Sequence, residues 1–210
     1  MKRVEFYYDL VSPYSYLAHG QIERLCEENG AELVLRPMLL GAVHKAAGIK
    51  APIETKAKAD YQARDIRRWA EYYGVPLEFP DPFPFRTLKS MRAAMFLQER
   101  GGLEAFTREA FALYWEEGGA PQDIEEADED GPVSFVARRM GADPEEVLEG
   151  ATRPEAKQDL KDATSEAVQR GVFGAPAFFV DGEMFWGNDR LHFVEAALKQ
   201  QPDLSRIREV

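Results

Sequence analysis

The chain has 210 residues, of which 45% are hydrophobic, and this is enough to form one substantial core or two smaller ones. Lys and Arg number 26 against 37 Asp and Glu, and the resulting net charge of −11 argues against a surface for nucleic acid or anionic membranes. No apolar run reaches the roughly 20 residues that cross a bilayer, and the amino terminus lacks the apolar core of a signal peptide. We therefore expect a globular cytoplasmic protein.

The first elements are a strand and a helix that meet at Ser12. Val4, Phe6 and Tyr8 alternate as in a partly buried strand, and apolar residues recur at helical spacing after Pro13. Proline is favoured at the first position of a helix, and serine is a preferred N-cap. The Ser12 hydroxyl should therefore lie beside the free backbone N–H groups of a helix start, where the peptide dipoles favour an anion or a thiolate.

Residues 12–15 read S-P-Y-S and look like the C-P-x-C redox motif of the thioredoxin superfamily with both sulfurs replaced by hydroxyls. A helix start in that fold can lower the pKa of a cysteine to about 3.5. The single cysteine of this chain, Cys26, falls on the apolar face of the helix and excludes an internal disulfide. We infer that a ligand supplies the sulfur and that Ser12 donates a hydrogen bond to it. The alternative is that Ser12 is only a helix cap.

The next elements change from alternating strand and helix to helices alone. The first helix should end near Asn29-Gly30, and residues 32–36 alternate as a second strand, which gives a parallel β-α-β unit. From Leu39 onward the pattern is helical. The predicted helices, several of which are followed by glycine, cover residues 56–73, 87–100, 103–117, 133–140, 144–149 and 155–170.

Two segments between these helices should lack helical structure. Residues 75–85 contain four prolines, which suit neither a helix nor a central strand, so this connector should be extended. Its aromatic residues, Phe83 among them, either line a substrate pocket or pack on the helices. The acidic run 123–130 should be a solvated loop, because it lacks the glycine and the ligand spacing of an EF-hand.

Strands return near the carboxyl end. Residues 177–180 are apolar, Asp181-Gly182 is a hairpin turn signal, and residues 183–186 form the return strand. Asn188 is then predicted to cap a helix that runs to about Lys199, with Asp189 in its first turn.

An X-Pro bond stands just before this hairpin, in Gly174-Ala175-Pro176. It enters a strand opposite Ser12, where the thioredoxin fold keeps its cis-proline. The residue before that proline offers its backbone to a bound peptide. We expect Ala175 and Pro176 to face the Ser12 hydroxyl.

Several blocks of the sequence resemble the 2-hydroxychromene-2-carboxylate isomerases and the related kappa-class glutathione transferases. These blocks are F-Y-Y-D-L-V-S-P-Y-S-Y-L, D-Y-Q-A-R-D-I-R-R-W-A-E-Y-Y-G-V-P-L-E-F-P, G-V-F-G-A-P-A-F-F-V and F-W-G-N-D-R-L. They stand in the same order as in that family and span Val4 to about Leu198. W-G-N-D-R is closer to the isomerases, since kappa transferases usually carry F-G-S-D-R.

The resemblance implies an α/β fold of the DsbA-like thioredoxin type, with the order β-α-β … β-β-α and a large all-helical insertion. Residues 1–38 and 171–200 would form the thioredoxin-like domain, residues 39–170 the helical insertion, and residues 201–210 a carboxyl-terminal tail.

The resemblance also implies a glutathione site and a homodimer. Ser12 matches the serine that hydrogen-bonds the glutathione sulfur, and Ala175, before Pro176, matches the residue whose backbone pairs with the cysteinyl unit. Asp189 and Arg190 match the pair near the γ-glutamyl end, where a carboxylate can hold the ammonium group.

Three further residues bear on this site. Lys58 matches a basic residue that contacts glutathione, and Asp65 matches an acidic residue that reaches across the dimer. Both lie on a charged helix, so plain solvent exposure is the alternative. Ile49 stands where the family usually has an asparagine that contacts glutathione, so one polar contact is missing or comes from elsewhere.

The isomerase branch implies that glutathione is a nucleophilic cofactor that is not consumed. Its thiolate adds to an aromatic unsaturated keto acid, the former double bond rotates, and elimination regenerates the alkene. The protein keeps the sulfur ionised near pH 7, which makes Ser12 the catalytic residue. Tyr14, Trp186 and Phe83 are candidates for the aromatic substrate pocket, with core packing as the alternative for Trp186.

Other functions stay open. A kappa-like transferase would consume glutathione, whereas a non-catalytic binding protein on the same scaffold would have lost it, for which Ile49 is the best argument. A dithiol oxidoreductase is disfavoured by the missing cysteines. His19, His44 and His192 lack the spacing of metal ligands, so no metal is predicted.

Overall fold

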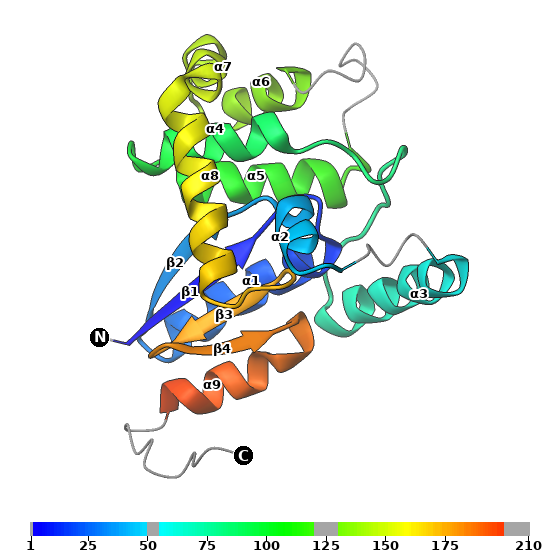
Figure 1. Ribbon diagram of the computed structural model, residues 1–210. Coiled ribbons are helices and arrows are strands. Elements are labelled where there is room, and N and C mark those ends of the chain that lie inside the picture. The colour runs from blue at the N-terminus through cyan, green and yellow to red at the C-terminus, as the bar shows by residue number, and fades with distance from the viewer. Residues whose placement is uncertain (1, 50–54, 120–129, 200–210) are drawn as a thin grey trace.

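The computed structural model describes residues 2–49, 55–119 and 130–199, so the predicted tail 201–210 and residues 123–129 of the acidic run lie outside it. Within these ranges four strands form one mixed sheet in the order β2-β1-β3-β4 (Figure 1). β1 pairs in parallel with β2 and antiparallel with β3, which pairs antiparallel with β4. The predicted β-α-β and β-β-α units are thus confirmed. The strands are β1 (Arg3–Tyr8), β2 (Glu32–Pro37), β3 (Ala177–Val180) and β4 (Glu183–Trp186).

Every helix predicted between residues 56 and 170 is present. The largest shifts, of three residues, are at the start of α6, which begins at Asp130 and so takes in the last residue of the predicted acidic loop, and at the end of α7. The helices are α1 (Pro13–Glu28), α2 (Leu40–Ala46), α3 (Lys56–Tyr73), α4 (Leu88–Gln98), α5 (Leu103–Trp115), α6 (Asp130–Arg139), α7 (Pro144–Thr152), α8 (Pro154–Gln169), η2 (Asn188–Arg190), a single 3₁₀ turn, and α9 (Leu191–Lys199).

Two local predictions differ from the structure. The short helix α2 was not predicted; it has a single fully buried residue, Val43, and its N-cap residue, Leu39, has no side chain that can cap. The prediction that Asn188 caps the last helix is wrong. Gly187, with φ of 102°, holds the N-cap position of η2, and α9 follows from Leu191. The Asn188 carbonyl instead accepts a hydrogen bond from the Tyr73 hydroxyl of α3.

Helices cover both faces of the sheet. The alternation along β1 sends Val4, Phe6 and Tyr8 to the face that packs against α1 and α9. Tyr7 points to the opposite face, where its cluster includes Val43 of α2 together with Ala167 of α8. Figure 1 shows α8 crossing one face of the sheet while α1 lies behind it.

The helices α4, α5, α6 and α7 form a lobe at one end of the sheet, which we call the helical lobe (Figure 1). Its core is continuous with the α1 face of the sheet and contains Phe96, Phe111 and Trp115. Helices α4 and α7 approach closely, since a Cβ atom at Gly150 would lie 2.4 Å from the Phe96 ring. In the described ranges, no helix combines the length and the apolar character needed to cross a membrane.

Candidate functional site

Ser12 is the N-cap of α1, as predicted. Its backbone is extended, its Oγ accepts a hydrogen bond from the Ser15 N–H at 3.2 Å, and Pro13 occupies the first helical position. The Ser12 N–H donates to the Asp9 carbonyl at 3.0 Å. Ser12 is only 3% exposed, so the joint between β1 and α1 buries this residue almost completely.

Ala175 and Pro176 lie opposite Ser12, and the peptide bond between them is cis. The Ser12 hydroxyl donates to the Ala175 carbonyl at 3.3 Å, across 163 residues of sequence. The Pro176 carbonyl accepts from the Gly187 N–H at 2.9 Å, which ties this segment to the start of η2. The structure therefore brings together the helix start and the X-Pro segment that the sequence pairs.

Trp186 lies against the segment that leads into Ala175. Its ring is 4.9 Å from that of Phe173, and a Cβ atom at Gly174 would lie 2.6 Å from the indole Nε1. The absence of a side chain at Gly174 is what allows this approach. Trp186 is still 46% exposed, so much of its side chain stays accessible beside this segment.

Asp189 and Arg190 lie in η2 and form an ion pair with each other. A Cβ atom at Gly187 would lie 2.5 Å from Asp189 Oδ1, so the carboxylate sits directly over the residue that binds Pro176. Both side chains keep substantial exposure. They are available at the edge of the Ser12 site on the side of η2.

Helix α3 contacts the start of α1 through Asp65 and the η2 segment through Tyr73. Near its middle, Asp65 accepts a hydrogen bond from the Tyr14 hydroxyl at 2.9 Å. Burial, and then the Asp65 carboxylate, raise the pKa of Tyr14 above its usual value. At the end of α3, the Tyr73 hydroxyl donates to the Asn188 carbonyl at 2.9 Å. The acidic residue predicted to reach a partner subunit thus already binds Tyr14 within the chain.

The other predicted site residues lie farther out. Lys58 is exposed on α3, and Ile49 is exposed just beyond α2. Phe83 packs on the helical lobe, with its ring 5.7 Å from Trp115 and near the rings of Phe79 and Phe85. Of the two possibilities for this connector, the structure shows packing for Phe83.

Sequence reasoning missed Asp9, which directly follows β1 and lies three residues before Ser12. Its carboxylate is 2% exposed and accepts hydrogen bonds from the N–H groups of Val11 and Leu40 and from the Thr87 hydroxyl. Burial raises the pKa of Asp9, although these hydrogen bonds oppose the change. The available signal was an acid that directly follows an aromatic strand and precedes two apolar residues in F-Y-Y-D-L-V.

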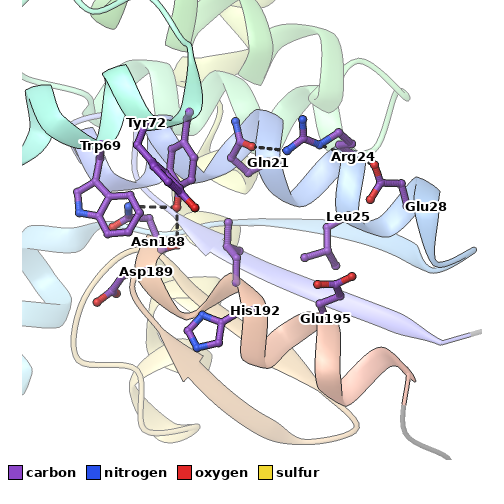
Figure 2. A pocket seen from close by; sticks show the side chains of 12 residues that line it. Gln21, Arg24, Leu25, Glu28, Trp69, Tyr72, Asn188, Asp189, His192 and Glu195 are labelled. Atoms are coloured by element: carbon purple, nitrogen blue, oxygen red, sulfur yellow. Dashed lines mark hydrogen bonds and ion pairs between the residues drawn. The ribbon is translucent and has the colours of Figure 1, made fainter.

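A cavity of about 590 Å³ opens beside this site, between α1, α3 and the η2–α9 segment. Figure 2 shows Trp69 and Tyr72 on one side and His192 with Glu195 on the other. Among the predicted site residues only Asp189 lines it, and Ser12 does not. The cavity therefore adjoins the η2 edge of the site and is separate from the hydroxyl.

Comparison with known proteins agrees with this geometry. The sequence model of the DSBA-like thioredoxin domain matches residues 3–199. A 2-hydroxychromene-2-carboxylate isomerase from Sphingobium xenophagum is 35% identical over 199 residues, covering 94% of this chain and 98% of that protein. Human glutathione S-transferase kappa 1 is 29% identical and covers 95% of this chain and 92% of that protein.

A solved structure of a 2-hydroxychromene-2-carboxylate isomerase superimposes with a TM-score of 0.82 at 30% identity, covering 93% of this chain and 94% of that chain. The similarity thus extends over the sheet and the helical lobe alike. The chain belongs to the DsbA-like thioredoxin family, in the group that contains the 2-hydroxychromene-2-carboxylate isomerases and the kappa-class glutathione S-transferases.

Proposed function

We propose that this protein is a glutathione-dependent isomerase that acts on an aromatic unsaturated keto acid, in the manner of its 2-hydroxychromene-2-carboxylate isomerase relatives. Those relatives and the kappa transferases support an enzyme of the isomerase or glutathione-transferase type. One observation supports the dependence on glutathione most directly. The Ser12 hydroxyl stands at the start of α1, 3.3 Å from the carbonyl of the residue that precedes Pro176.

The residues around Ser12 fit a small thiol peptide. The first N–H groups of a helix lack partners within the helix. Pro13 has no N–H and the Ser15 N–H is bound to Ser12, which leaves the Tyr14 amide facing the helix start. The Ser15 hydroxyl is fully buried, and its oxygen has no hydrogen-bond partner within the described residues. A helix start with spare donors suits a sulfur anion.

The flanking residues fit the two ends of glutathione. The backbone of Ala175 would pair with the cysteinyl unit, as peptides pair with a strand edge. Asp189 would hold the ammonium group of the γ-glutamyl end, and Arg190 and Lys58 could hold carboxylates. Glutathione, when bound, would supply a thiolate that adds reversibly to the double bond of the substrate.

The chain's own share is to keep that sulfur ionised and to hold it in place. A hydrogen bond from the Ser12 hydroxyl and the dipole of α1 both favour the charged form, and each unit of pKa depression corresponds to about 1.4 kcal/mol. Trp186, which is partly exposed beside the segment that leads into Ala175, can stack on an aromatic substrate. Phe83 is not part of this proposal, since it packs against Trp115.

Replacement of Ser12 by alanine tests the proposal. We expect the isomerisation rate of Ser12→Ala to fall by about 100-fold, as when one donor to a developing charge is removed. The loss of the cap should cost only about 1 kcal/mol of stability, so the protein should stay folded. The measurements are turnover of 2-hydroxychromene-2-carboxylate with glutathione present, circular dichroism, and calorimetric titration with glutathione.

Ser165→Ala is the matched control, because Ser165 is an exposed serine on α8 whose hydroxyl bonds only within its own helix. It should turn over substrate at the wild-type rate. Equal rates for Ser12→Ala and wild type would remove Ser12 from the mechanism.

A kappa-like transferase is the second candidate, supported by the 29% identity to human glutathione S-transferase kappa 1. The two activities differ in the fate of glutathione. An isomerase leaves its concentration unchanged over many turnovers, whereas a transferase consumes one glutathione for each product. Proton NMR of the reaction mixture distinguishes these outcomes.

A further inference from the structure

The joint between β1 and α1, which carries Ser12, is held first by hydrogen bonds of Asp9, the residue that follows β1. The Asp9 carboxylate accepts from the Val11 N–H at 3.2 Å, one residue before Ser12. The Asp9 carbonyl accepts from the Ser12 N–H at 3.0 Å. Asp9 therefore fixes both peptide groups that lead into the catalytic serine.

The remaining bonds of the Asp9 carboxylate go to two other helices. Its Oδ2 accepts from the N–H of Leu40, the first residue of α2, at 2.9 Å. A carboxylate at this position satisfies a free helix N–H and complements the helix dipole. Because Leu39 cannot cap α2 with its own side chain, Asp9 acts as the cap from a distance of 31 residues.

Thr87 makes the third contact with the Asp9 carboxylate, and its hydroxyl does not cap its own helix. Threonine is a preferred N-cap, and Thr87 holds the N-cap position of α4, yet its side chain makes no capping bond to that helix in the described structure. The hydroxyl donates instead to Asp9 Oδ1 at 2.8 Å, and the residue is 6% exposed. The start of α4 is thus directed at the joint.

A second contact from the helical lobe reaches the same joint. The indole N–H of Trp115, at the end of α5, donates to the Leu10 carbonyl at 2.9 Å. Trp115 is fully buried among the aromatic rings of the connector, so it cannot easily follow a displaced loop. Two parts of the lobe, the start of α4 and the end of α5, therefore hydrogen-bond to residues 9 and 10, while Ser12 itself bonds to Ala175.

We propose that Asp9 and Thr87 are positioning residues for Ser12: the Thr87 hydroxyl and the Asp9 carboxylate hold the joint in the conformation that directs the Ser12 hydroxyl at the X-Pro segment. The catalytic consequence rests on the proposed function, while the positioning itself is a property of the ligand-free protein. In this arrangement the helical lobe helps to set the geometry of the site.

The test compares two buried hydroxyls on the same helix. Thr87→Val keeps the shape and removes the hydroxyl that binds Asp9. Ser90→Ala removes a hydroxyl, 2% exposed, that pairs with the Tyr114 hydroxyl at 3.0 Å and does not touch the joint. Both variants lose one buried hydrogen bond and should lose similar global stability. Thr87→Ser restores the hydroxyl and is the rescue variant.

The first readout needs neither substrate nor glutathione. Amide hydrogen exchange, measured by NMR, reports on the Ser12 N–H bound to Asp9 and on the Ser15 N–H bound to Ser12. We expect both amides to exchange at least about tenfold faster in Thr87→Val than in Ser90→Ala, and Thr87→Ser to return to the wild-type rate. Equal exchange in Thr87→Val and Ser90→Ala would overturn the proposal.

The second readout is the split between kcat and KM. Thr87→Val should lower kcat by about tenfold with little change in the KM for substrate, because the misplaced group is the donor to the reacting sulfur. Ser90→Ala should leave both constants near wild type. A purely structural role for Thr87 predicts the same kinetics for the two variants and would contradict the proposal.

The two proposals fail in different ways. If the wild-type protein neither binds glutathione nor isomerises the substrate, the proposed function is wrong, while the exchange comparison still decides whether Thr87 positions Ser12. If Ser12→Ala abolishes turnover but Thr87→Val behaves as Ser90→Ala, only the positioning role is wrong. Asp9→Asn is a further variant; should it fail to fold, Thr87→Val still gives the answer.

Discussion

Burial decides the charge of His19, which lies on the core side of α1. Its ring is 5.2 Å from that of Phe111, and its Nε2 is 3.4 Å from a Glu23 carboxylate oxygen, without a hydrogen bond among the described residues. Burial, and then the charge of Arg108, lower the pKa of His19 to about 4. The imidazole is therefore neutral at pH 7, and the close carboxylate does not make an ion pair with it.

This shift predicts a loss of stability on acidification. Between pH 6.5 and about 4 the unfolded chain binds a proton at His19 that the folded chain refuses, so the free energy of unfolding falls as the pH falls. The shift corresponds to a loss on the order of 3 kcal/mol. Burial also lowers the pKa of His44, which adds to the loss of stability as the pH falls below 6.5.

Urea unfolding at pH 7, 5.5 and 4 measures this effect. His19→Phe should lose less stability over this range than the wild-type protein, since an apolar ring takes no proton in either state. His192→Gln, at an exposed position on α9, is the control and should keep the wild-type slope. Parallel slopes for wild type and His19→Phe would show that His19 keeps its ordinary pKa in the fold.

Residues with local signals were predictable, and residues defined by distant partners were not. Ser12 carries its evidence in its neighbours, because Pro13 and the change of period mark a helix start. Asp9 has no such signal, since its partners Leu40 and Thr87 are 31 and 78 residues away. The prediction that Asn188 caps the last helix failed for the same reason, because the Asn188 carbonyl binds Tyr73, which lies 115 residues away.

At the scale of elements, the contact of α4 with α7 depends on a missing side chain. Gly150 in α7 is buried against the Phe96 ring of α4, and a Cβ atom there would lie 2.4 Å from ring atoms. Phe96 is itself 5% exposed and has little room to move. A larger residue at position 150 must separate the two helices.

We expect Gly150→Ala to destabilise the protein by about 2 kcal/mol, within the usual cost of overpacking a core. Gly20→Ala is the control, because Gly20 is an exposed helix residue of α1 with nothing within 4 Å of the added Cβ. That change should stabilise the protein by about 0.5–1 kcal/mol through the lower flexibility of the unfolded chain. Thermal unfolding of both variants tests the pair, and a stabilising Gly150→Ala would refute the close packing.

Element boundaries followed from sequence where the helix has its own periodicity and stop signal. Helix α3 was predicted with its bounds, since an amphipathic pattern runs up to Gly74, which adopts the left-handed conformation with φ of 67°. Helix α2 does have a stop signal, since Gly48 just beyond it has φ of 66°, but it is only seven residues long, has no capping side chain of its own, and takes its cap from Asp9. Its existence depends on the tertiary fold.

At the scale of the whole molecule, a cluster of charges joins the first two strands to the segment that follows α8. Glu5 of β1 accepts hydrogen bonds from Arg170, just after α8, at 2.9 Å for each of two nitrogens, and from Arg36 of β2 at 3.0 Å. The Arg170 guanidinium also lies 3.9 Å from the centre of the Phe179 ring. Although burial raises it, the two arginines bring the pKa of Glu5 below its usual value.

Loss of one partner should therefore cost more than loss of both. Arg170→Met should destabilise the protein by about 2 kcal/mol at pH 7, because the Glu5 charge loses its main partner. Adding Glu5→Gln should recover part of that loss, so urea unfolding of the double-mutant cycle should give a coupling of more than about 1 kcal/mol. The exposed pair Lys56–Asp60 in α3 is the control, with a coupling near zero. Additive effects at Glu5 and Arg170 would contradict the prediction.

The order of strands and helices was predictable because periods of 2 and 3.6 residues alternate clearly along the sequence. How the helical lobe meets the sheet was not predictable. That arrangement depends on single contacts such as Thr87 with Asp9 and Trp115 with Leu10, which join residues 78 and 105 positions apart.

A hydroxyl has one proton, and in this structure the Ser12 proton goes to the Ala175 carbonyl. A sulfur anion that accepts this hydrogen bond from Ser12 leaves the Ala175 carbonyl without a donor, at a place where Ser12 is 3% exposed and water has little access. A thiol that carries a nearby amide N–H can donate a new hydrogen bond to the Ala175 carbonyl, whereas 2-mercaptoethanol has no amide N–H. Under the proposed function, the hydrogen bond from Ser12 to Ala175 therefore predicts that the protein binds a peptide thiol more tightly than 2-mercaptoethanol.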